Sequence, residues 1–341
     1  METSVGDIAP EVRPLTWSRT VAREMVHRAS VAEVLLTDVR MLDGGGRRES
    51  GGHPESSVRP ESGVRPESGA RPESRILESD VFEAAASWPR SHPTFPRGGA
   101  DLHSPLMIVE TLRQLGIYLP LRYFAVPASS HLLITDLFFD IDPSAEPRAT
   151  AGATGVTCLV RVSDVRRGRG DAVTGLRLHV SFLVDGVPFA RAGGGARFLG
   201  AAQYAALRAR SAGSAAPLTS GAARRERPDS AGLGVTSAHD VVIGLDGGGL
   251  LVEPADPRHP FFFDHATDHV PGMVLLEAAR QAAAVTSGGT LLRPTAGRLN
   301  AARFVEYSPP ARVLCVPHHA TCVFRILQGG EQKAFGILRY R

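Results

Sequence analysis

An internal repeat constrains this chain more than any other feature. Residues 92–95 (HPTF) recur as residues 259–262 (HPFF), and residues 110–114 (ETLRQ) recur as residues 277–281 (EAARQ). Both pairs are separated by 167 positions with no gap between them, and Asp101 matches Asp268 at the same spacing. Similarity at one fixed spacing indicates duplicated structural units. The sequence therefore predicts two copies of one domain, fused in a single chain of 341 residues.

Each copy is predicted to contain one long helix followed by several strands. The two helices are expected at residues 106–117 and 271–285, where apolar residues dominate. Runs typical of strands follow each helix. They lie at residues 131–140, 155–165 and 176–189 in the first copy, and at 312–316, 322–327 and 335–340 in the second. One further strand is expected before each helix, at 31–36 and 241–245. This order predicts an α+β fold class for each half.

Polar segments set the expected domain boundaries. Residues 44–74 contain a proline every six residues from Pro54 to Pro72, each followed by Glu-Ser, and they have no apolar face. Such a segment cannot offset its ordering entropy by burial, so we expect a disordered insertion. The chain is therefore divided into an N-terminal tail (1–22), a first domain (23–200) carrying the insertion, a Ser-, Ala-, Gly- and Arg-rich linker (201–234) and a second domain (235–341).

The second predicted helix carries a narrow polar stripe. Between Met273 and Val285 the polar residues are Glu277, Arg280 and Gln281. Their spacing of i, i+3 and i+4 places them on one face. A helix that is apolar nearly all round is buried, and a buried carboxylate needs a partner. We weigh two interpretations: an ion pair that fixes the packing of the two halves, and a carboxylate held in a cleft for acid–base chemistry.

The first predicted helix repeats this stripe with Glu110, Arg113 and Gln114. The two copies differ in the loop before the helix. Residues 264–272 include His265, Asp268 and His269, whereas the matching residues 97–105 contain fewer histidines and aspartates. Backbone N–H groups at Gly272 and Met273 are expected to be free at the helix start, where they can bind a developing oxyanion. Nothing in the sequence directs these His and Asp side chains to one point, so no metal site is expected.

Composition argues against several function classes. The chain has 38 Lys and Arg residues, of which Lys333 is the one lysine, but a formal net charge of only +3. Because the arginines are scattered rather than clustered, nucleic-acid binding is not expected. The three cysteines do not have the spacing of a zinc site, which favours a reduced, cytoplasmic protein. No apolar run is long enough for a membrane helix and no secretory signal is visible, so no membrane contact is expected.

The repeated helix resembles a known group of enzymes. A Pro-Gly pair followed by Glu five residues after the Gly and Gln four residues later resembles the central helix of hotdog-fold acyl carrier protein dehydratases. More specifically, residues 259–283 (HPFFFDHATDHVPGMVLLEAARQAA) are similar to the A-factor biosynthesis (AfsA-type) family of actinobacteria. Segments of the first half agree with that family: residues 26–28 (VHR), 33–37 (EVLLT), 88–93 (WPRSHP), 110–114 and 126–127 (VP). The resemblance covers most of the chain outside the tail, insertion and linker.

The resemblance implies a tandem double hotdog, in which each long helix is wrapped by a curved antiparallel sheet. It also implies an acyltransferase that moves a β-ketoacyl group from an acyl carrier protein to the hydroxyl of dihydroxyacetone phosphate, without a cofactor. The product is the precursor of a γ-butyrolactone-type or related furan or butenolide signal. The insertion, Leu121-Arg122 and residues 96–99 depart from the family pattern. Because these departures lie in the first copy, we expect the second-half site to be the better preserved.

A mechanism follows from these expectations. The acyl thioester would enter a tunnel between the two halves, lined by both helices. Backbone N–H groups near Gly272 would polarise its carbonyl. The general base is left open among Glu277, His265, His269 and, in the first copy, Glu110. Substrate binding is expected from Met273, Arg280, Gln281, Arg113, Gln114 and Asp268, together with Gly272.

Two alternatives stay open at this point. One is another hotdog enzyme acting on acyl carrier protein thioesters, either a dehydratase or a thioesterase. The other is a non-catalytic protein that binds an acylated signal. The reaction product distinguishes the first alternative, and binding without turnover distinguishes the second.

Overall fold

A computed structural model describes residues 13–42, 81–92, 101–149, 152–210, 226–247 and 249–341. The long helices and the strands account for the fold. They are β1 (Leu36–Leu42), β2 (Val81–Pro89), α1 (Pro105–Tyr123), β3 (His131–Ile141), β4 (Ala153–Arg167), β5 (Val173–Val184), β6 (Val187–Leu199), α2 (Ala201–Arg210), β7 (Ile243–Asp246), β8 (Gly249–Val252), α3 (Gly272–Thr286), β9 (Ala296–Ala301), β10 (Arg312–His318), β11 (Thr321–Gln328) and β12 (Glu331–Arg339).

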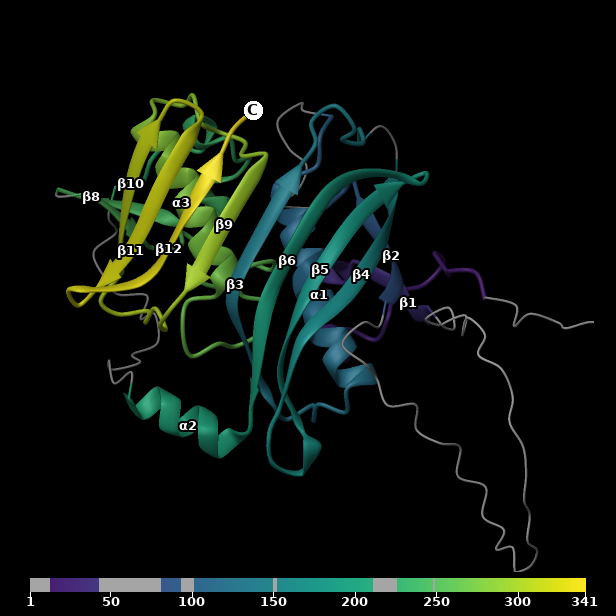
Figure 1. Ribbon diagram of the computed structural model, residues 1–341. Coiled ribbons are helices and arrows are strands. Elements are labelled where there is room, and N and C mark those ends of the chain that lie inside the picture. Colours follow the sequence, from purple (N-terminus) through teal and green to yellow (C-terminus); the bar gives the residue numbers. More distant parts are fainter. Residues whose placement is uncertain (1–12, 43–80, 93–100, 150–151, 211–225, 248) are drawn as a thin grey trace, which may run out of the picture.

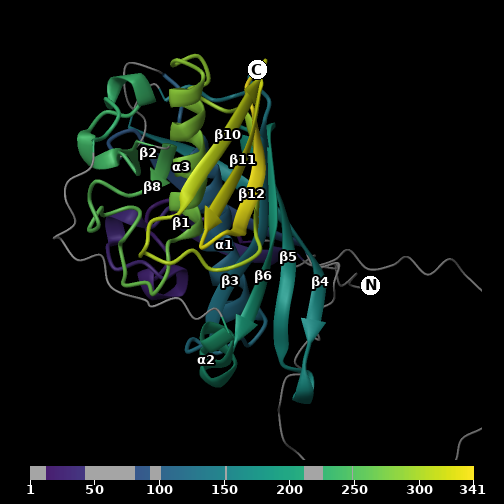
Figure 2. The ribbon, with the colours of Figure 1, turned by 90° about the vertical axis from the view of Figure 1, so that its left-hand side faces the viewer.

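The described strands form one antiparallel sheet with the order β1-β2-β4-β5-β6-β3-β9-β12-β11-β10-β8-β7. The two halves join where β3 pairs with β9, with Phe138 opposite Arg298. Helices α1 and α3 lie on the same side of this sheet, α1 against the first half and α3 against the second (Figures 1 and 2). The α+β class and the tandem arrangement expected from the repeat are confirmed.

Both long helices begin within one residue of the expected positions, α1 at Pro105 and α3 at Gly272. The Ser104 side chain caps α1 by accepting a hydrogen bond from Leu106 N at 3.3 Å, and Pro105 occupies the first turn. In α3, Pro271 stands one position earlier, as the N-cap residue. The apolar residues of both helices are buried against the sheet, which provides most of the driving force for the fold.

Two strand predictions differ from the structure. Residues 31–36 were expected as a strand, but Val31–Glu33 form a 3-10 turn and β1 begins only at Leu36. The reason is that the Gln114 side chain, rather than a neighbouring strand, accepts hydrogen bonds from the N–H groups of Leu35 and Leu36.

Residues 176–189 were expected as one strand, but they turn at Asp185-Gly186 and belong to β5 and β6. Both turn residues have positive φ angles (51° and 78°), as a tight Asp-Gly hairpin requires.

The expected linker also contains structure. Residues 201–210 form α2, which contacts the second half through two side chains. The hydroxyl of Tyr204 donates to Asp268 at 2.6 Å, and Arg208 pairs with Glu306 at 2.7 Å. The expected insertion at 44–74 lies outside the described residues. We propose that the first domain comprises residues 23–200 and the second domain residues 235–341.

Candidate active site

In α1, the polar stripe is a closed hydrogen-bonded cluster. Glu110 is 1% exposed and Gln114 is fully buried. Arg113 Nε donates to Glu110 Oε2 at 2.8 Å, and Gln114 Nε2 donates to Glu110 Oε1 at 2.7 Å. The carboxylate is therefore held by its two neighbours on the same helical face, as the spacing predicted.

Helix α3 repeats this cluster. Arg280 Nε donates to Glu277 Oε2 at 2.9 Å, and Gln281 Nε2 donates to Glu277 Oε1 at 2.8 Å. Arg280 also donates to the carbonyls of Leu233 and Leu292, at 2.8 and 2.9 Å. Nη1 makes both of these contacts, and Nη2 donates to Glu277 Oε1 at 2.6 Å, so every nitrogen of the Arg280 guanidinium has a protein acceptor.

The glutamine of each cluster fixes the chain that precedes it in the sequence. Gln114 Oε1 accepts from Leu35 N and Gln281 Oε1 accepts from Val242 N, both at 2.9 Å. These partners are separated by 207 positions, not 167. The duplication therefore also includes the residues before His92 and His259. Extra residues in the first copy change the spacing there, so a repeat at 167 positions does not reveal this part.

Each copy contains a second buried pair at this upstream position. His92 Nε2 lies 3.1 Å from Glu33 Oε2, and His259 Nε2 lies 3.0 Å from Asp240 Oδ1. Both histidines are 3% exposed. This equivalence supports a structural role for the two repeated histidines.

A turn next to each arginine is also repeated. Arg113 Nη2 donates to the carbonyl of Val26 at 3.2 Å, as Arg280 does to that of Leu233. The residue after each carbonyl is in the left-handed region, His27 with φ 49° and Gly234 with φ 64°. The same backbone shape therefore carries an imidazole in the first copy and a bare glycine in the second.

The first cluster has an additional arginine. Arg28 Nε donates to Glu110 Oε1 at 3.1 Å, and Arg28 Nη1 donates to the carbonyl of Phe261 at 2.8 Å. The position equivalent to Arg28 in the second copy is Val235. Arg28 thus links the cluster of the first copy to the loop that precedes α3.

That loop is anchored to the first copy through Asp264. Its carboxylate accepts from Ala29 N at 2.6 Å and from Ser30 N at 3.2 Å. The next residue, His265, consequently lies beside α1 of the first copy, although it belongs to the second.

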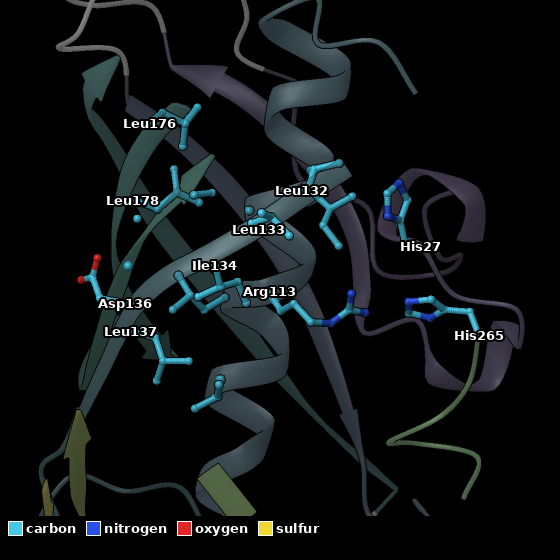
Figure 3. Close-up of a pocket in the computed structure, with 17 residues that line it drawn as sticks. His27, Arg113, Leu132, Leu133, Ile134, Asp136, Leu137, Leu176, Leu178 and His265 are labelled. Carbon is cyan, nitrogen blue, oxygen red and sulfur yellow. The ribbon is translucent and has the colours of Figure 1, made fainter. Parts of the chain in front are cut away.

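Three of these residues, His27, Arg113 and His265, line a pocket with a volume of about 150 Å³. Figure 3 shows Arg113 extending toward His27 and His265 at one end, with leucines of the sheet at the other. The remaining wall comes from α1, β3, β5 and β6 and is apolar apart from Asp136 of β3: Val109, Leu112, Gly116, Ile117, Leu132, Leu133, Ile134, Asp136, Leu137, Leu176, Leu178, Gly194, Gly195 and Ala196. Among the described residues that line this pocket, His265 is the one from the second copy. This pocket lies on α1 and the sheet of the first half, whereas the tunnel expected between the two halves stays a prediction.

The charges around the pocket set the protonation of its acid and bases. Burial alone would raise the pKa of Glu110, but Arg113 and Arg28 with the Gln114 hydrogen bond outweigh burial and lower this pKa to about 2. Burial, Arg113 and Arg28 lower the pKa of His265, and Asp264 and Glu110 only partly oppose them. Burial, Arg113 and His265 lower the pKa of His27. At neutral pH, both imidazoles that line the pocket are therefore neutral, and Arg113 is paired with an ionised Glu110 that lies outside the pocket lining.

The sequence matches the model of the A-factor biosynthesis hotdog domain (AfsA) over residues 67–200 and 249–298. It is 33% identical over 304 residues to a 2-oxo-3-(phosphooxy)propyl 3-oxoalkanoate synthase of Streptomyces virginiae, which covers 87% of each chain. The chain belongs to the A-factor biosynthesis hotdog family.

Other relatives carry the same name. This member of the family is 32% identical over 244 residues to the synthase of Streptomyces griseus, covering 69% of this chain and 76% of that one. Among solved structures it is similar to an acyl-ACP thioesterase from Bacteroides thetaiotaomicron, with 10% identity and a TM-score of 0.46 over 76% of this chain and 98% of that chain. A 12:0-ACP thioesterase from Umbellularia californica has a TM-score of 0.43 and 10% identity, covering 76% and 97%.

Several residues expected in the site of this family member lie elsewhere. His269 Nδ1 contacts Asp268 Oδ1 at 2.7 Å, and the His269 ring packs edge-on against Phe304. The Asp268 carboxylate also accepts a hydrogen bond from the Tyr204 hydroxyl. Neither His269 nor Asp268 is among the described residues that line the pocket. The same holds for the other expected site residues Glu110, Gln114, Gly272, Met273, Glu277, Arg280 and Gln281. Of the expected site residues, Arg113 and His265 line the pocket, and the structure adds His27 to them.

Within the described ranges, no three His, Cys, Asp or Glu side chains converge as metal ligands would. No helix in the described part of the chain has the length and apolarity to cross a bilayer.

Proposed function

We propose that this chain transfers a 3-oxoacyl group from an acyl carrier protein thioester to the hydroxyl of dihydroxyacetone phosphate, in the biosynthesis of a γ-butyrolactone-type signal. The relatives' name describes a 2-oxo-3-(phosphooxy)propyl ester of a 3-oxoalkanoate. Dihydroxyacetone phosphate is the alcohol half of that ester. The observation that carries the proposal is a pocket with an apolar wall at one end and Arg113, His27 and His265 at the other.

The apolar end of the pocket suits the acyl chain. Leu112 and Ile117 of α1 line the pocket together with Leu176 and Leu178 of β5. Burial of each methylene group there contributes about 0.8 kcal/mol to binding. The thioester carbonyl then lies toward the polar end, where Arg113 and the two histidines are.

His265 serves as the general base. Its neutral imidazole accepts the proton of the acceptor hydroxyl while that oxygen attacks the thioester carbonyl carbon. The tetrahedral intermediate collapses by breaking the C–S bond, and the proton passes from His265 to the departing thiolate. The products are the ester and the free thiol of the carrier.

Arg113 binds the acceptor phosphate. Its Nε and Nη2 hold Glu110 and the Val26 carbonyl, whereas Nη1 has no hydrogen bond to any described residue. A guanidinium with a free N–H edge in a partly dry pocket is well suited to a phosphate oxygen. Glu110, with its low pKa, keeps Arg113 in this orientation and does not act as the base.

The test is product analysis with the purified protein. We expect 3-oxoacyl carrier protein and dihydroxyacetone phosphate to give the phosphorylated ester by mass spectrometry. His265→Ala should lower kcat/KM by about 10²- to 10⁴-fold. His269→Ala is the matched control, because His269 lies in the same loop but outside the pocket, and it should stay within about twofold of the parent.

Other products would contradict the proposal. Free 3-oxo acid as the sole product indicates a thioesterase, and an enoyl product indicates a dehydratase. Tight binding of the acyl carrier without turnover indicates a binding protein. A 3-oxoacyl coenzyme A donor tested in parallel shows whether the carrier protein itself is required.

A further inference from the structure

His27 occupies a backbone conformation that a histidine adopts only at a cost. Its φ of 49° lies in the left-handed region, where the Cβ atom of an L-residue crowds the backbone. The equivalent residue of the second copy, Gly234, has φ 64° and no Cβ.

The duplicated turn requires this conformation in both copies. The carbonyl just before it accepts a hydrogen bond from the helix arginine, Arg113 in the first copy and Arg280 in the second. The second copy meets the requirement with glycine and no strain. The first copy meets it with a bulky imidazole, and backbone strain of this kind accumulates at functional sites.

The imidazole of His27 lines the pocket. It lies beside Arg113 and near His265, and Figure 3 places all three at the polar end. Burial and the Arg113 charge hold the pKa of His27 below its ordinary value, so one ring nitrogen is a donor and the other an acceptor. His27 therefore offers an N–H group at the polar end of the pocket, which is where the proposed reaction takes place.

We propose that His27 is a second catalytic residue of this pocket, whose ring N–H donates to the oxyanion of the tetrahedral intermediate while His265 takes the proton. This inference rests on the proposed acyl transfer. The oxyanion forms when the acceptor oxygen adds to the thioester carbonyl, and it disappears when the C–S bond breaks. A donor aimed at that oxygen stabilises the transition state more than the bound substrates.

His27→Gly is the direct test, because glycine already occupies the equivalent turn of the second copy. We expect its urea unfolding midpoint to equal or exceed that of the parent, since glycine removes the strain of the left-handed turn. We expect kcat to fall by about 10²- to 10³-fold, with KM for dihydroxyacetone phosphate changed by less than about threefold. His27→Asn keeps an N–H donor and tolerates positive φ, so it should recover part of kcat.

The matched control is His319→Gly. His319 has the same φ of 49° but is exposed in the turn between β10 and β11. It should keep the parent kcat. Full kcat in His27→Gly, an equal loss in His319→Gly or an effect on KM alone would overturn the role of His27. If the parent protein makes no ester, the proposed function itself fails, which is observed before any variant is compared.

Discussion

Arg28 and Glu110 form an ion pair at 2.9 Å in which the two side chains are 3% and 1% exposed. The second copy has no such partner for Glu277, because Val235 stands where Arg28 stands in the first. The extra arginine therefore distinguishes two otherwise equivalent clusters. Its second contact, to the Phe261 carbonyl, draws the loop carrying His265 toward the first cluster. The asymmetry of the two copies is what creates one composite site.

The pH profile should report the charges around His265. Because its pKa is lowered from 6.5, we expect kcat/KM to stay high down to pH 6.5 and to fall below it as the imidazole becomes protonated. Asp264 raises this pKa and Arg28 lowers it. Asp264→Asn should therefore move the acid limb to lower pH, and Arg28→Met should move it to higher pH. Kinetics from pH 5 to 8 check both directions, and parallel shifts of the same sign would contradict the assignment of the base.

Glu277 should matter for stability and not for turnover. Glu277→Gln leaves the buried Arg280 without its counter-charge, so we expect the free energy of unfolding to fall by about 3–5 kcal/mol. The double variant Glu277→Gln/Arg280→Met should recover part of this loss, because it removes the unpaired charge. Urea denaturation measures the stability, and kcat per folded molecule should remain within about twofold. A selective loss of kcat in the folded variant would return Glu277 to the mechanism.

The apolar wall should determine which acyl chains are accepted. Leu178 of β5 lines the pocket and is 2% exposed. Leu178→Trp fills part of the space with a larger side chain, and each displaced methylene group costs about 0.8 kcal/mol of binding, or roughly fourfold in kcat/KM. A panel of 3-oxoacyl donors of increasing length measures the effect. The longest donors should lose most and the shortest least, whereas a uniform loss would indicate general damage to the fold.

His103 should make the protein less stable in mild acid. It is 3% exposed and its Nε2 lies 2.8 Å from Thr154 Oγ1. Burial and the Arg293 charge lower its pKa from 6.5 to about 4, so the unfolded chain binds a proton more readily than the folded one. Stability conferred by neutral His103 is present above pH 6.5 and is lost as the pH falls toward 4. Unfolding measured at pH 7 and pH 4.5 should show a drop of at most about 3 kcal/mol that His103→Gln reduces. An unchanged drop would rule out His103 as its source.

The sequence by itself determined the duplicated frame. The fixed 167-residue offset predicted two equivalent halves, and the i, i+3, i+4 spacing predicted the two Glu–Arg–Gln clusters. These inferences hold because they depend on local periodicity, which a helix converts directly into a shared face. The Asp185-Gly186 hairpin was also readable in principle, because that dipeptide favours a tight turn.

Tertiary structure alone decided which copy forms the pocket. His27 and His265 meet there. Arg28 helps to hold the loop of His265 in place through Phe261, which is 233 positions away in the sequence. Local pattern carries no information about such contacts, because they depend on how the two halves pack across β3 and β9. The sequence placed the better site in the second copy, where His265, Asp268 and His269 are dense. In the structure, the two parts of that loop lie in different places, because they have hydrogen-bond partners on different elements. Asp264 holds His265 against the first copy. Asp268 and His269 contact each other, and Asp268 accepts from Tyr204 of α2.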